Sequence, residues 1–67
     1  MIINLNGQPT VLQKNNASVS DLVKERNLAA EGTAVAVNGR LCKAADWDAT
    51  TLREGDAVTI INAAFGG

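Results

Sequence analysis

Hydrophobic and polar residues alternate with a period of two near both ends of the chain, and this predicts β-strands there. In "MIINLNGQPTVL", Ile3 and Leu5 fall on one face of a first strand. Asn6-Gly7 can supply the positive-φ positions of a type I′ turn into a second strand, from about residue 8 to residue 12. Pro9 has no N–H to donate to a neighbouring strand, so the second strand is expected at a sheet edge.

The period changes to that of a helix in "SVSDLVKERNL". Ser18 can cap the first turn, and Asp21 stands three residues later, near the positive end of the helix dipole. The apolar stripe of this short helix consists of Val19, Leu22 and Val23, at i, i+3 and i+4, with Leu28 able to close it.

The two-residue period of β-strands returns in the second half of the chain. "TAVAVNG" predicts a third strand with an Asn38-Gly39 turn, and "RLCKA" predicts a short fourth strand with ambiguous limits. "ADWDATTL" is typical of a turn or a single helical turn, "REGD" of a tight turn, and "AVTII" of a strongly β-branched last strand. The residues expected in the core from this half are Val35, Val37, Trp47, Leu52, Val58 and Ile60.

The order ββαβ(β)β predicts an α+β fold, with one helix packed across a mixed sheet of four or five strands. If the first and last strands pair in parallel at the centre, the helix makes the long crossover that such pairing requires. This arrangement is the ubiquitin-like β-grasp. Residues 1–62 are expected to form this domain, and residues 63–67 an extended, flexible Gly-Gly tail.

Composition narrows the class of partner. The chain has 67 residues and a net charge of −1, with Lys and Arg scattered singly and only Trp47 and Phe65 aromatic. The chain therefore has no cluster of basic residues to neutralise phosphates and too few aromatic residues to stack on bases. This argues against nucleic acid as a partner. No apolar stretch approaches the roughly 20 residues of a membrane span, and the first residues lack the features of a secretory signal. The single Cys42 fits a reducing cytoplasm.

The candidate catalytic groups favour structural interpretations. There is no histidine, and Cys42 lies among apolar residues of an expected strand, as a core or partly covered residue does. The carboxylates of "DWD" and "REGD" suit turn chemistry better than a metal site. Trp47 could anchor an interface, but in so small a core it is expected to supply packing. The sequence therefore predicts no active site and no bound metal.

The tail "AAFGG" is the remaining candidate, against the simpler interpretations of an idle end or an expression artefact. A terminal glycine carboxylate has a pKa of about 3.5, so it is ionised at neutral pH. In this ionised form it is a poor acyl acceptor. Conversion to an acyl adenylate makes the carbonyl electrophilic. Because Gly66 and Gly67 lack β-carbons, they could pass through a narrow channel of an activating enzyme.

These motifs together resemble the ThiS family, the sulfur carriers of thiamine biosynthesis. The resemblance covers the whole chain: the first hairpin, "SVSDLV", "AVAVNG", the following Trp47, "LREGDAVTII" and the final Gly-Gly. Phe65 departs from the family pattern, where small or aliphatic residues are commoner.

The resemblance implies a carrier that is itself a substrate. A ubiquitin-activating-like (ThiF-type) enzyme would use ATP to adenylate Gly67, and a cysteine-derived sulfur donor would convert the adenylate to a thiocarboxylate. A ThiG-type thiazole synthase would then take the sulfur. The carrier itself would bind no cofactor and be a monomer when free. Docking is assigned to the tail and, more loosely, to the last strand: Ala63, Ala64, Phe65 and Gly66, with Thr59 and Ile61.

Three alternatives stay open from the sequence. The small subunit of molybdopterin synthase is also a β-grasp sulfur carrier with a Gly-Gly end. A ubiquitin-like modifier would use the same adenylate to join Gly67 to lysines of other proteins. A plain interaction domain would make no use of its tail.

Overall fold

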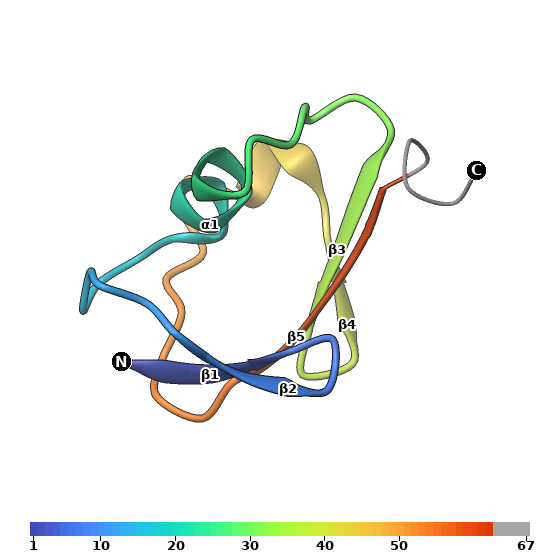
Figure 1. The fold of residues 1–67 in the computed structure, drawn as a ribbon. Coiled ribbons are helices and arrows are strands. Elements are labelled where there is room, and N and C mark those ends of the chain that lie inside the picture. Colours follow the sequence, from blue (N-terminus) through green and yellow to red (C-terminus); the bar gives the residue numbers. More distant parts are fainter. Residues whose placement is uncertain (63–67) are drawn as a thin grey trace.

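The computed structural model describes residues 1–62, which form one helix packed against a five-stranded sheet (Figure 1). The elements are β1 (Ile2–Leu5), β2 (Gln8–Val11), α1 (Val19–Glu25), β3 (Thr33–Val37), β4 (Arg40–Cys42), the 3₁₀ helix η1 (Ala44–Asp46) and β5 (Ala57–Asn62). The strand order is β2-β1-β5-β3-β4, with β1 and β5 parallel and the other neighbours antiparallel. The predicted β-grasp is confirmed, with five strands.

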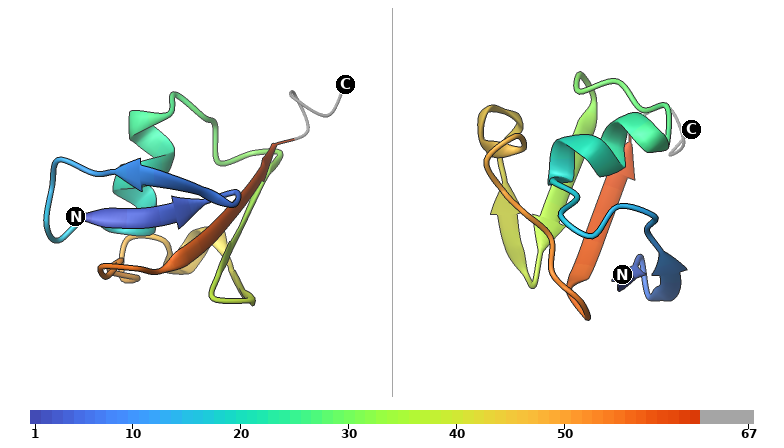
Figure 2. Two further views of the ribbon diagram at one scale, coloured as in Figure 1. Left: turned by 60° about the horizontal axis from the view of Figure 1, so that its bottom comes forward. Right: turned by 90° about the vertical axis from the view of Figure 1, so that its left-hand side faces the viewer.

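The helix α1 lies across one face of the sheet (Figure 2), and the core residues are buried between the two. Every second residue of β5 is buried, so Val58 and Ile60 point inward as the alternation predicts. The helix contributes its predicted stripe, whose three members are buried, and Leu28 is partly buried against them. Val37 is also only partly buried against the core. The hydrophobic pattern therefore identifies the core correctly.

Trp47 and Leu52 belong to the same buried core. Trp47 is 5% exposed, and its Nε1–H donates a 2.8 Å hydrogen bond to the carbonyl oxygen of Cys42. The packing role expected of this indole is confirmed by its burial in the core, and the hydrogen bond satisfies its single donor. Cys42 is partly buried against the same cluster, as expected.

Both Asn-Gly turns have the backbone of a type I′ hairpin. Asn6 and Gly7 have φ values of 51° and 82°, and Asn38 and Gly39 have 52° and 82°. The first turn sends β2 to the sheet edge, where Pro9 is tolerated. β2 ends at Val11, one residue before the predicted limit, although the Leu12 N–H still bonds the Met1 carbonyl oxygen at 2.8 Å.

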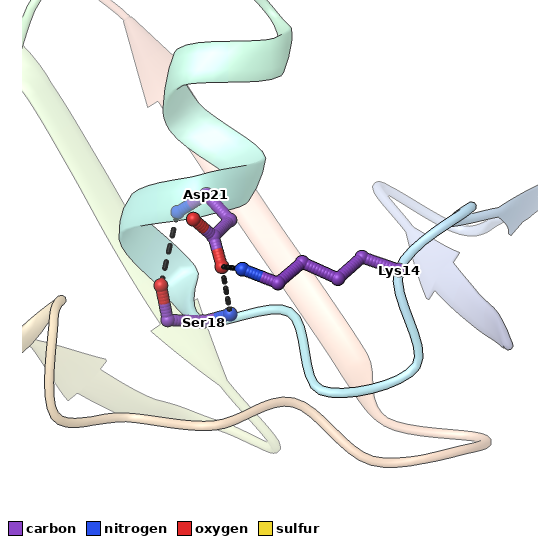
Figure 3. Close-up of polar contacts among 3 residues, drawn as sticks. All are labelled: Lys14, Ser18 and Asp21. Atoms are coloured by element: carbon purple, nitrogen blue, oxygen red, sulfur yellow. Dashed lines mark hydrogen bonds and ion pairs between the residues drawn. The ribbon is translucent and has the colours of Figure 1, made fainter.

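The helix begins at the predicted capping box (Figure 3). The Ser18 hydroxyl accepts the Asp21 N–H at 3.0 Å, and Asp21 Oδ2 accepts the Ser18 N–H at 2.9 Å. Lys14 Nζ also lies 3.0 Å from Asp21 Oδ2. The Ser18 N–H, followed by the Lys14 ammonium, holds the pKa of Asp21 below its ordinary value of 3.8. Two otherwise unpaired backbone donors are satisfied here.

The helix ends in a Schellman motif, which was not predicted from the sequence. Asn27 has a φ of 57° and donates its N–H to the Lys24 carbonyl, while Leu28 donates to the Val23 carbonyl. Asparagine replaces the usual glycine at this left-handed position. The motif explains how Leu28 reaches the core beside Val23.

Candidate functional site

The candidate site lies where β5 ends, beside the segment that joins α1 to β3 (Figure 1). The predicted tail residues, Ala63, Ala64, Phe65, Gly66 and Gly67, lie outside the described residues, and so does the expected Gly-Gly tail as a whole. The structure does place the strand that leads to them.

Asn62, the last described residue, is a buried polar side chain at the end of β5. Its Nδ2 donates a hydrogen bond to the Thr33 hydroxyl, which donates in turn to the Ala29 carbonyl oxygen. The inward parity of positions 58, 60 and 62 could have identified this side chain from the sequence. The chain of hydrogen bonds ties the end of β5 to the start of β3.

The opposite edge of β5 is bonded by the turn between β1 and β2. The Asn6 carboxamide accepts the Ile60 N–H at 2.8 Å and donates to the Ile60 carbonyl oxygen at 3.3 Å. These atoms belong to residues 54 positions apart in the chain. The sequence predicts only a turn conformation for Asn6, and this contact with Ile60 was not predicted.

The second turn asparagine bonds the other end of the same strand. Asn38 Oδ1 accepts the Ala57 N–H at 3.0 Å, and Asn38 Nδ2 donates to Asp56 Oδ1 at 3.0 Å. Asp56 Oδ2 accepts the Arg53 N–H at 2.8 Å, which confirms its predicted turn role. Glu54 has a longer-range role, because its carboxylate accepts the Ile2 N–H at 2.9 Å.

The sheet face turned away from α1 carries no charged residue at any of its outward strand positions. These positions are Ile2, Asn4, Pro9, Val11, Ala34, Ala36, Leu41, Ala57, Thr59 and Ile61. The part beside the end of β5 consists of Ala34, Ala36, Leu41, Thr59 and Ile61, and we call it the outer patch. Leu41 is 69% exposed and Ile61 is 65% exposed. Thr59 and Ile61, predicted as partner surface, therefore both face outward.

The described residues offer little else for chemistry. Among residues 1–62, no cluster of three or more His, Cys, Asp or Glu side chains has the arrangement of a metal site. No helix in this part of the chain is long and apolar enough to cross a bilayer. A depression of about 280 Å³ beside the Asn6–Ile60 contact is lined by Leu5, Asn6, Arg26, Leu28 and Ile60. The end of β5 and the outer patch remain the principal features.

Comparison with known proteins gives one family. The family model for ThiS matches residues 3–67. A crystal structure of the thiamine biosynthesis protein ThiS from Geobacter metallireducens is 31% identical, with a TM-score of 0.84, and the match covers 92% of this chain and 93% of that one. An NMR structure of a thiamine biosynthesis protein from the same organism is 35% identical, with a TM-score of 0.79, covering 91% and 81%. No curated protein matches closely enough to count as a relative.

Proposed function

The chain belongs to the ThiS family, and on that premise we propose that it is a sulfur carrier of thiamine biosynthesis that bears its sulfur on Gly67. It acts as the substrate of partner enzymes and not as a catalyst. The observation that carries this proposal is the construction of β5, whose last described residue is tied into the fold by its own side chain. A segment that follows such a strand starts from a fixed place on a rigid scaffold.

The proposed chemistry begins at the Gly67 carboxylate. One of its oxygens attacks the α-phosphorus of ATP on a ThiF-type enzyme, and pyrophosphate leaves. Cysteine-derived sulfur, at the oxidation level of sulfide, then attacks the carbonyl carbon, and AMP leaves. The product is a C-terminal thiocarboxylate, which is anionic and nucleophilic at neutral pH. On a ThiG-type thiazole synthase the carbon–sulfur bond breaks and the sulfur passes to the thiazole precursor. An oxygen atom from that precursor or from water restores the carboxylate of the carrier.

The outer patch is the proposed docking surface for the adenylating enzyme. The five residues 63–67 can span at most about 18 Å when fully extended. An enzyme that holds Gly67 in its active site must therefore contact the carrier close to Asn62. Ile61 adjoins that residue, and Ala34 lies opposite Ile61 in the sheet. Exposed apolar side chains without charges suit burial against a protein surface.

The test is the intact mass of the carrier after incubation with the adenylating enzyme, ATP and a sulfur source. We expect one carboxyl oxygen to be replaced by sulfur, and a variant lacking Gly67 to keep its mass. An unchanged native mass with an enzyme that charges another carrier would overturn the proposal. Conjugates on denaturing gels that vanish without Gly67 would indicate a ubiquitin-like modifier instead.

A further inference from the structure

We propose that Asn6 is a positioning residue for the charging of Gly67, because its side chain extends the parallel pairing of β1 and β5 toward the tail. The inference rests on the proposed function. It gives a residue of the first hairpin a role in positioning the C-terminus, at the other end of the sequence.

The main chain of β1 stops pairing with β5 before β5 ends. The N–H of Asn4 bonds the Asp56 carbonyl at 2.9 Å, and the N–H of Asn6 bonds the Val58 carbonyl at 2.8 Å. In a parallel ladder, the next bonds on β5 would come from Ile60. At Asn6 the main chain turns away, with its φ of 51°, so no further backbone group of β1 can continue the ladder.

The Asn6 carboxamide supplies the two missing partners. Its Oδ1 takes the Ile60 N–H in place of a backbone carbonyl, and its Nδ2 approaches the Ile60 carbonyl in place of a backbone N–H. A carboxamide has the same donor and acceptor groups as a peptide unit. The side chain therefore adds one more step to the ladder and carries the pairing of β5 to within two residues of Asn62.

With this step in place, the end of β5 is bonded on both sides. β3 pairs with Ile61 on one edge, and Asn62 is tied to Thr33, while Asn6 bonds Ile60 on the other edge. Without the carboxamide, the last part of β5 would lose the two hydrogen bonds that hold Ile60 on the edge facing β1. This segment would then have to be ordered when the carrier docks, and the free-energy cost of that ordering would weaken binding to the enzyme.

Asn38 provides a matched control at the other end of the same strand. It occupies the same position of the same turn type, with a φ of 52° before a glycine at 82°, and its carboxamide also bonds β5. Asn6→Gly and Asn38→Gly both keep a residue that tolerates positive φ, so both turns survive. Only Asn6→Gly removes a contact near Asn62.

The experiment has two readouts on native protein, Asn6→Gly and Asn38→Gly, with thermal melts to show that all are folded at the assay temperature. Amide exchange by NMR should be about fivefold to tenfold faster at Ile60 in Asn6→Gly, the change expected from about one net hydrogen bond. Amides of α1 should be unaffected. In adenylation assays, the KM for the Asn6→Gly carrier should rise about fivefold while kcat stays native, and Asn38→Gly should change KM less than twofold.

The outcomes separate this inference from the proposed function. Native protein that is charged, together with equal KM values for the two variants, would overturn the role of Asn6 and leave the carrier function standing. If the amide of Ile60 exchanges as slowly in Asn6→Gly as in native protein, the extended ladder is overturned, whatever the charging assay gives. Native protein that is not charged by an active enzyme would overturn both. A fall in kcat with unchanged KM would also contradict the argument, because the ordering cost belongs to docking.

Discussion

Replacing Ile61 with alanine should weaken docking to the adenylating enzyme much more than it weakens the fold. Ile61 faces outward on β5, directly opposite Ala34, and 65% of it is exposed. The side chain has therefore already buried about one third of its surface in the free protein. The rest is available to a partner that covers the outer patch.

The magnitude follows from this division. Complete burial of an isoleucine side chain is worth about 1.5–3 kcal/mol. The exposed 65% corresponds to about 1–2 kcal/mol at a fully covered interface, or roughly a 5- to 30-fold rise in KM when docking is at equilibrium. The buried part corresponds to about 0.5–1 kcal/mol of folding stability, a small share of the roughly 3–10 kcal/mol expected for a domain of this size.

The assay is steady-state pyrophosphate release by the adenylating enzyme over a range of carrier concentrations, with urea unfolding of each variant. Val11→Ala is the control, because Val11 is 62% exposed on the same sheet face but lies in β2, opposite Ile2 at the start of β1. We expect its KM to stay within twofold of native. Equal rises in KM for both variants, or a native KM for Ile61→Ala, would refute the reasoning. A concentration-dependent dimer that Ile61→Ala dissociates would show that a second copy covers the patch.

Two further predictions concern the scaffold. Leu22 is fully buried in α1, so Leu22→Ala should lower the free energy of unfolding by about 2–5 kcal/mol, measured by urea titration, and a loss below about 1 kcal/mol would contradict the packing. The lowered pKa of Asp21 stabilises the folded state above its ordinary value of 3.8, and this contribution is lost as pH falls through the lower folded value. The urea midpoint of native protein should therefore exceed that of Asp21→Asn at neutral pH and approach it below about pH 3.8; a constant difference throughout the acid range would exclude this linkage.

The features that were predictable from the sequence are those specified by neighbouring residues. The Asn-Gly pairs determine the turns because positive φ is a local requirement, and Ser18 with Asp21 determines the helix start because the capping box spans only four residues. The inward set of β5 follows from a period of two. The same local information left β4 ambiguous, because a strand of three residues contains too few positions to show an alternation.

The features that were not predictable depend on partners far away in the chain. Nothing near Asn6 indicates that its carboxamide bonds Ile60, because the contact exists only after β1 and β5 have paired in parallel. The bond from the Glu54 carboxylate to the Ile2 N–H has the same origin. For Asn27, the local sequence could have indicated a left-handed helix end, because asparagine tolerates positive φ better than most residues. Long-range polar contacts are thus the part of the site that can be identified only from the structure.

These polar contacts matter because the register of β5 against β1 and β3 decides which of its side chains face outward. The strand uses one alternation for two purposes: Val58, Ile60 and Asn62 hold the fold, while Thr59 and Ile61 face outward. A slip of one residue against β1 or β3 would exchange the two sets, exposing the core residues and burying the outer patch. It would also move the end of β5, and with it the starting point of the residues that follow. Carboxamides that bond Ala57 at one end and Ile60 near the other oppose such a slip on both edges, since each bond requires one register. The requirement for folding and the proposed requirement for aiming the terminal group therefore converge on the same strand.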